Sequence, residues 1–231
     1  MTTVNYPYPR PQAVKLKVKG YVPYPKSALA AVYDIFRDIE PVNRAHEEKE
    51  PPPFAVKEFS RSGFAITSYL ALPTDMVSDR LKAKGLFIAD NPIYLPQTDL
   101  PPLYELKDIA VNFTTPTAFK YNTGYVPEFY APIFIKSAID SYKRIIPGLP
   151  EFSVSDILKY IEFTDYNLQK SRYQLTKDLA IQGFKGRLRL RFKPVAVPEL
   201  KLLIIYLLES ASICGVGVKK AWGMGDLNIA F

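Results

Sequence analysis

The chain has 231 residues, of which 48% are hydrophobic and 23% are charged, and no run of eighteen apolar residues is present to span a membrane. One cysteine, Cys214, excludes an internal disulfide, and a single histidine leaves no set of Cys and His ligands for a zinc site. The formal net charge of +7 favours an anionic partner such as nucleic acid.

The first half of the chain predicts a βαββαβ unit. Its expected elements are a strand at 13–20, a helix capped by Ser27 and running to about Asp38, strands at 54–59 and 63–72, a helix capped by Thr74 and ending before Gly85, and a strand within 86–95. Strand 13–20 alternates with a period of two and places Lys15, Lys17 and Lys19 on one face. This order is typical of a ferredoxin-like domain, which we place at residues 1–98.

The second half predicts the same order of elements without sharing the sequence of the first. The elements are strands at 106–113, 157–163 and 181–192, helices at 131–146 and 198–212, and a strand at 226–231. We therefore expect an α+β fold with tandem ferredoxin-like domains, the second spanning residues 99–231. The boundary is expected in the proline-rich stretch 92–102.

The strand near residues 183–193 is the more basic of two expected central strands. Its alternation places five cations on one face: Lys185, Arg187, Arg189, Arg191 and Lys193. In a βαββαβ unit the first and third strands are central, and central strands do not need lysine as protection against edge pairing. If helices cover one face of each sheet, the two charged faces form a cleft suited to single-stranded or hairpin RNA. A merely solvated face is the alternative.

A glycine-rich loop, GVGVKKAWGMG at 215–225, lies between the last helix and the last strand. Backbone N–H groups of Gly215, Gly217, Gly223 and Gly225 can approach a phosphate closely, and Lys219 and Lys220 add positive charge. The spacing and the order from helix to strand match neither of the familiar phosphate-binding loops. A tight turn between helix and strand is the alternative.

His46 is the candidate for acid–base chemistry, because imidazole exchanges protons near neutral pH. We expect it just beyond the first helix, in a polar and exposed segment. Tyr33, on the first helix, is a candidate for a proton relay, with a place in the core as the alternative. Lys49 and Lys57 are candidates for stabilising charge on a phosphate without metal, or are solvated lysines.

The glycine loop, the strand GFKGRLRLRF and the early residues around Tyr33 and His46 together resemble the CRISPR repeat-processing endoribonucleases of the RAMP superfamily, the Cas-six family. The resemblance spans nearly the whole chain. It implies tandem ferredoxin-like domains and a single metal-independent cut within each CRISPR repeat, by attack of a 2′-hydroxyl that leaves a 2′,3′-cyclic phosphate and a 5′-hydroxyl. His46 then matches the general acid–base histidine and Tyr33 a tyrosine of some members. Where those members carry a lysine this chain has Pro52, so Lys49 or Lys57 would substitute.

The expected partner is CRISPR repeat RNA, as precursor and product, with other CRISPR effector subunits or a second copy of the chain as further candidates. No cofactor, metal or membrane is expected, and without a visible secretory signal we expect a cytoplasmic protein. A RAMP subunit that binds guide RNA without cutting is the main alternative function. A generic RNA-binding protein outside CRISPR is the third.

Overall fold

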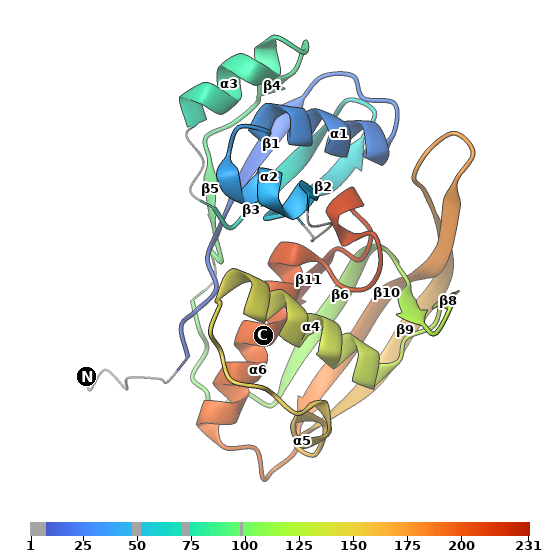
Figure 1. Ribbon diagram of the computed structural model, residues 1–231. Helices are drawn as coiled ribbons and strands as arrows, with labels where there is room; N and C mark the ends of the chain where they lie inside the picture. Colours follow the sequence, from blue (N-terminus) through green and yellow to red (C-terminus); the bar gives the residue numbers. More distant parts are fainter. Residues whose placement is uncertain (1–7, 48–51, 71–73, 98) are drawn as a thin grey trace.

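The chain folds into two large antiparallel sheets, which lie one above the other in the view of Figure 1, and a small two-stranded sheet. The structure is a computed structural model and describes residues 8–47, 52–70, 74–97 and 99–231. Within those residues, none of the helices combines the length and the apolar character needed to cross a bilayer. The combination of helices with antiparallel sheets confirms the predicted α+β fold.

The first sheet has the strand order of a ferredoxin-like unit, β2-β3-β1-β4, with β5 also paired to β1. Its elements are β1 (Ala13–Lys19), α1 (Pro25–Phe36), α2 (Glu40–Glu47), β2 (Phe54–Ser60), β3 (Gly63–Ser68), α3 (Thr74–Lys82), β4 (Phe87–Ile88) and β5 (Ile93–Leu95). One core joins the helices to the sheet, and it contains Leu16, Val32, Phe36 and Ile66. As predicted, the first and third strands are the central pair.

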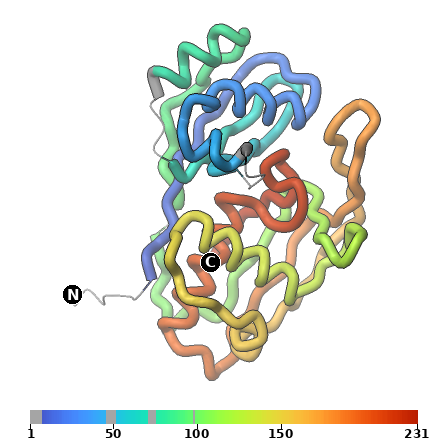
Figure 2. Tube along the Cα trace, viewed as in Figure 1, coloured from blue at the N-terminus to red at the C-terminus, as the bar shows by residue number. Residues whose placement is uncertain are grey.

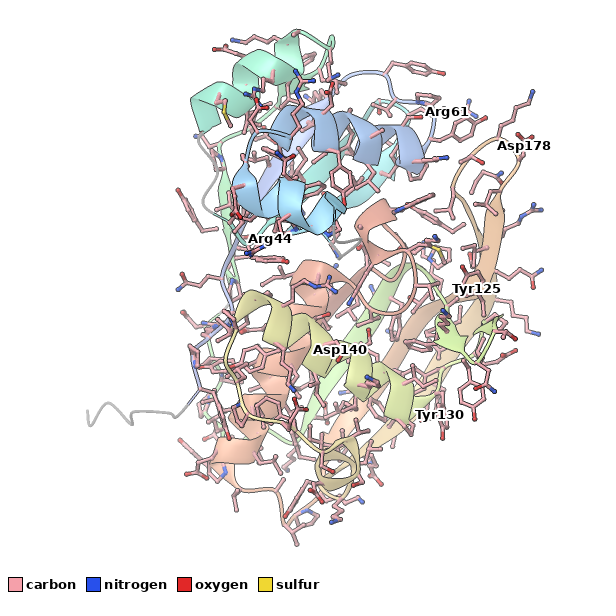
Figure 3. All side chains as sticks on the ribbon, in the orientation of Figure 1. Arg44, Arg61, Tyr125, Tyr130, Asp140 and Asp178 are labelled. Atoms are coloured by element: carbon pink, nitrogen blue, oxygen red, sulfur yellow. The ribbon has the colours of Figure 1, made fainter. Side chains whose placement is uncertain are left out.

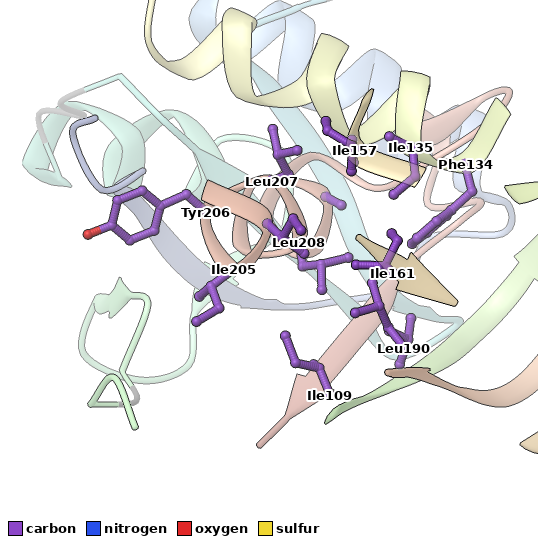
Figure 4. Packing of buried hydrophobic residues seen from close by; sticks show 14 of the residues in the cluster. Ile109, Phe134, Ile135, Ile157, Ile161, Leu190, Ile205, Tyr206, Leu207 and Leu208 are labelled. Carbon is purple, nitrogen blue, oxygen red and sulfur yellow. The ribbon is translucent and has the colours of Figure 1, made fainter. Parts of the chain in front are cut away.

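The second sheet repeats this order as β11-β6-β10-β9. The second half contains β6 (Asp108–Thr117), β7 (Phe119–Tyr121), β8 (Gly124–Val126), α4 (Ala131–Ile145), α5 (Val154–Leu158), β9 (Ile161–Gln174), β10 (Ala180–Phe192), α6 (Pro198–Cys214), a short 3-10 helix η1 (Lys220–Trp222) and β11 (Leu227–Ala230). Strands β7 and β8 pair with each other as a separate two-stranded sheet. Helices α4 and α6 pack on one face, where Phe134 and Leu208 meet Ile109 and Leu190 (Figure 4). The strands β9 and β10 extend as a long hairpin toward the first sheet (Figure 1).

The structure differs from the prediction at and just after the first helix. Ser27 does not cap α1, because the helix begins at Pro25, with Tyr24 at the N-cap and proline in the first turn, where no N–H is needed. His46 lies beyond the first helix, as expected, but its backbone belongs to an additional helix, α2, that was not predicted. Glu40 lies in the first turn of α2, where the helix dipole favours a carboxylate, and it pairs with Arg44 one turn later at 3.9 Å.

The strand predicted at 157–163 is only partly correct. Residues up to Leu158 form α5, whose N-cap Ser153 accepts a hydrogen bond from the backbone N–H of Asp156 at 3.3 Å. Strand β9 begins at Ile161 and runs to Gln174, well beyond the predicted end. Its length comes from pairing with β10 along almost the whole of both strands, a long-range contact that a local pattern does not encode.

Candidate functional site

The glycine loop lies at the junction of the two sheets. The side chains of Ala221 and Trp222 in η1 pack against the core of the first sheet, and Trp222 also packs with Met224 in a smaller cluster. Figure 2 shows this loop between the helices of the first half and the sheet of the second. The loop therefore connects the two halves of the molecule physically.

Most backbone donors of this loop are used inside the protein. Gly217 N–H donates to Ser137 Oγ at 3.0 Å, Val218 N–H to the Ala118 carbonyl at 2.9 Å, and Gly225 N–H to the Pro116 carbonyl at 3.1 Å. Gly217 and Gly225 both have positive φ, and a Cβ at either position would collide with a backbone carbonyl. The glycines thus allow close packing at the junction, while a direct contact of the loop backbone with RNA stays a prediction.

The two lysines of the loop have different surroundings. Lys219 places its ammonium 4.8 Å from the ring centroid of Trp222. Lys220 turns inward and donates a hydrogen bond to Ser141 Oγ at 3.2 Å. Burial, reinforced by the nearby positive charge of Arg144, lowers the pKa of Lys220 to about 8. Lys220 is thus a partly desolvated cation between the two sheets, a feature that its position in the sequence did not distinguish from Lys219.

Lys57 lies in strand β2 and is buried. Its ammonium forms an ion pair with the carboxylate of Asp226, just before β11, and also donates to the carbonyl of Ser212 at 3.4 Å. The charge of Lys57 is matched by a buried carboxylate from the other half of the molecule. We therefore propose a structural role for Lys57 and seek the phosphate-stabilising cation elsewhere.

Tyr33 lies on α1 and lines a groove of about 430 Å³ together with Val42 and Asn43 of α2 and Trp222 of η1. Its ring packs edge-on against Phe54, with 5.1 Å between the centroids, and burial raises the pKa of its hydroxyl. Tyr33 therefore stays protonated at neutral pH.

The backbone of His46 lies one helical turn after Val42 and Asn43 in α2. Val42 and Asn43 of this helix line the groove that Tyr33 also lines, and the side chain at position 46 lies outside the described part of the structure. Lys49 lies outside the described residues.

The predicted basic face of β10 is present. Lys185, Arg187, Arg189 and Arg191 are exposed and Lys193 is half-buried, while Phe184, Leu188, Leu190 and Phe192 point into the core. Arg189 pairs with Asp108 at 2.5 Å and with Asp165 at 3.2 Å, and Arg191 lies 3.6 Å from Glu162. Carboxylates on the neighbouring strands thus balance part of the stripe. Among the residues that the structure describes, no carboxylate lies at ion-pair distance from Lys185 or Arg187.

Lys185 and Arg187 line a polar groove of about 420 Å³ on the open face of the second sheet. Amide and hydroxyl side chains from the two neighbouring strands complete it: Asn112, Asn167, Gln169 and Ser171. Such groups donate and accept hydrogen bonds with base edges and with ribose. The sequence did not indicate them, because isolated polar residues on an exposed strand face look the same whether or not they line a groove.

The basic face of β1 is also partly neutralised. Lys15 forms an ion pair with Glu58, and Lys17 lies 3.7 Å from Asp90. Lys19 is exposed at the end of the strand. The expected cleft between two fully basic faces is therefore a mixed surface, and among the described residues Lys19, Lys185 and Arg187 are its exposed cations without an ion-pair partner.

Three comparisons with known proteins agree. The model of the family described as CRISPR-associated endoribonuclease Cas6 matches residues 111–227, about half of the chain. A CRISPR-associated endoribonuclease Cas6 from Streptococcus thermophilus is 29% identical over 124 residues, which are 52% of this chain and 49% of that protein. The matched region thus spans about half the length of this relative.

Solved structures share the fold along nearly the whole chain. A Cas6 product complex superposes with a TM-score of 0.69 at 20% identity, covering 95% of this chain and 100% of that one. Thermus thermophilus Cas6 gives a TM-score of 0.62 at 23% identity over 96% and 98% of the two chains. A Cas6-related protein from Pyrococcus furiosus gives 0.58 at 14% identity over 95% and 98%. Tandem ferredoxin-like folding and the family match lead to one conclusion: this chain belongs to the CRISPR-associated endoribonuclease Cas6 family.

Proposed function

We propose that this protein is an endoribonuclease that cuts precursor CRISPR RNA once within each repeat. The observation that carries the proposal is the match of residues 111–227 to the Cas6 family model, which covers the basic strand and the glycine loop. Support comes from the Streptococcus thermophilus relative, which is named an endoribonuclease. We propose further that residues 1–98 and 99–231 are its two domains, with the reacting groups at their junction.

The proposed reaction needs no metal. The 2′-hydroxyl oxygen attacks the adjacent phosphorus while its proton passes to a base, and the bond from phosphorus to the 5′-oxygen breaks. The leaving oxygen takes up a proton, so the products are a 2′,3′-cyclic phosphate and a 5′-hydroxyl. His46 is proposed as the group that exchanges these protons. Tyr33, protonated at neutral pH, is suited to donate a hydrogen bond and not to act as a base.

The surfaces around the junction are proposed to hold the RNA. Lys185 and Arg187 bind phosphates in the polar groove of the second sheet, and Lys19 extends the positive surface on the first. Asn112, Asn167 and Gln169 are placed to contact unpaired nucleotides that lie across β10. This division assigns affinity to the cations and sequence preference to the amides.

The experiment is incubation of the purified protein with 5′-labelled repeat RNA in EDTA, followed by mapping of the product ends. We expect one cut that leaves a 2′,3′-cyclic phosphate. His46→Ala is expected to slow cleavage by roughly 10²- to 10⁴-fold while RNA affinity stays unchanged. Equal cleavage by wild type and His46→Ala would remove the histidine from the mechanism.

Tight binding without any cut would instead favour a guide-binding subunit of a CRISPR effector complex. The groove on the second sheet supports RNA binding in either case. Association with other effector subunits or with a second copy of the chain stays a prediction.

A further inference from the structure

A small pocket at the domain junction brings together groups from distant parts of the sequence. Pro52 and Phe54 line it from the first half, and Arg144, Cys214 and Lys220 line it from the second. Arg144 lies in the last turn of α4, Cys214 ends α6, and Lys220 begins η1. Three elements of the second domain thus deliver side chains to the point where the first domain's β2 begins. Figure 3 labels Asp140, which lies one helical turn before Arg144 on α4.

The pocket carries positive charge that its own residues offset only in part. Burial and the charge of Arg144 lower the pKa of Lys220 most, Cys214 and the carboxylate of Asp140 act in the opposite direction, and Lys57 adds a smaller lowering effect. Asp140 is itself 3.7 Å from Lys136 on the outer side of α4, and Lys57 is matched by Asp226. In the described part of the chain, neither Arg144 nor Lys220 has a carboxylate at ion-pair distance.

Two neighbouring cations in a partly desolvated site raise each other's free energy, and an entering anion relieves that cost. Cys214 does not supply the anion, because burial raises the pKa of its thiol despite the cations around it. The pocket would therefore stabilise an anion that is not one of the described side chains. Its occupant must be small or reach in with a single group, since the free space inside is about 20 Å³.

The position of the pocket relates it to the proposed chemistry. The Phe54 ring that lines it also packs against Tyr33. Pro52 lies six residues after His46, with α2 ending at Glu47 between them. Pro52, which lines the pocket, thus follows the helix that carries the proposed proton-exchanging group by a few residues in the sequence.

We propose that Lys220 and Arg144 form the site that binds the non-bridging oxygens of the scissile phosphate, with Ser141 holding the ammonium in place. The inference rests on the proposed endoribonuclease function and names the cation for which Lys49 and Lys57 were the sequence candidates. Neither Lys220 nor Arg144 gives up a proton in this step. Their fixed charges stabilise the additional negative charge that builds on phosphorus when the 2′-oxygen attacks and before the 5′-oxygen leaves.

The test is single-turnover cleavage of labelled repeat RNA by wild type, Lys220→Met, Arg144→Met and the control Lys136→Met. Lys136 is a solvent-exposed lysine on α4, the helix that carries Arg144, and pairs with Asp140 on the outer surface. At saturating protein we expect Lys220→Met and Arg144→Met to cut at least about 100-fold more slowly. Each variant removes a positive charge that stabilises the negative charge on phosphorus in the transition state. The protein concentration at half-saturation changes by less than about tenfold. Lys136→Met retains the wild-type rate.

Lys220→Arg distinguishes charge from structure. It keeps a cation that does not titrate below pH 10, so it restores part of the cleavage rate and removes any fall in kcat/KM above pH 8 that comes from Lys220. Melting temperatures at pH 7 identify variants that fail to fold, and Lys220→Met is expected to melt no lower than wild type.

The outcomes separate the two proposals. A wild-type protein that binds but does not cut contradicts the proposed function itself. Normal cleavage by wild type together with unchanged saturating rates in Lys220→Met and Arg144→Met overturns only the phosphate site. A loss of affinity with an unchanged saturating rate also overturns it. A lower melting temperature of Lys220→Met with normal cleavage would show that Lys220 serves folding and not cleavage, and would overturn the proposal.

Discussion

Lys57 and Asp226 form an ion pair that joins strand β2 of the first sheet to the start of β11 in the second. Their side chains are only 5% and 8% exposed. The pair connects residues 169 positions apart in the sequence. This contact therefore holds the two halves of the molecule together, and it does not stabilise either sheet alone.

Removal of one partner of this pair is expected to be costly. Lys57→Met leaves a carboxylate buried without its cation, so the free energy of unfolding should fall by about 3–5 kcal/mol. The double variant Lys57→Met, Asp226→Asn removes the unpaired charge and should recover part of that loss. Urea unfolding monitored by circular dichroism measures both. Identical midpoints for wild type and Lys57→Met would contradict a buried pair.

Gly225 is expected to tolerate no side chain. It has a φ of 71°, and a Cβ would collide with the carbonyl of Val216. Gly148 has a φ of 81° but open space around it, so it is a matched control. Gly148→Ala should cost about 1–2 kcal/mol from backbone conformation alone, and Gly225→Ala about 2–5 kcal/mol in total. Equal unfolding free energies of the two variants would show that the loop relaxes freely.

RNA affinity should depend unequally on the cations of β10. Lys185→Gln or Arg187→Gln should weaken binding and lower the slope of log K against log salt by roughly 0.7–1, since each removes one phosphate contact. Arg189→Gln should have a smaller effect, because that guanidinium already pairs with Asp108 and Asp165. Filter binding between 50 and 200 mM salt, a range over which roughly tenfold or larger effects are usual, measures the slopes. Equal slopes for all three variants would contradict the proposal that Lys185 and Arg187 contact phosphates while Arg189 is already paired.

Stability should depend on pH through Lys220. Its pKa is about 8 in the folded protein against 10.5 for an ordinary lysine, so between these values the unfolded chain binds a proton that the folded chain does not. The free energy of unfolding of RNA-free wild type should therefore rise with pH over this window, by about 1–3 kcal/mol after allowance for partial exposure. Lys220→Met lacks this contribution, so its stability advantage at pH 7 should shrink by pH 10. A constant difference between the two proteins would contradict a desolvated Lys220.

Local patterns predicted much of the fold. Period-two alternation located β1 and β10 and their exposed cations, and the helical spacing of residues 198–212 located α6, because both features follow from which side chains face the core. The helix α2 was missed, since it is short and mostly polar and only Val42 and Ala45 mark its buried face. Propensity failed at 157–163 because pairing with β10 decides where β9 begins.

The site was less accessible from the sequence. Lys57 and Lys220 both look like surface lysines, and only the meeting of the two sheets buries the first against Asp226 and places the second beside Arg144. Arg144 had no sequence signal beyond a basic last turn of α4. The glycines did indicate close backbone approach, but the neighbours they approach are Ala118 and Val216 of the same chain.

The central claim is cleavage of repeat RNA by attack of a 2′-hydroxyl. Its most direct test compares repeat RNA with the same RNA carrying a single deoxy sugar at the nucleotide whose 2′-hydroxyl would attack, both in EDTA with purified protein. We predict one cut in the all-ribose RNA, none in the substituted RNA, and equal affinity for both. Cleavage of the deoxy RNA at the same position, or a cut that requires added divalent metal, would contradict the account.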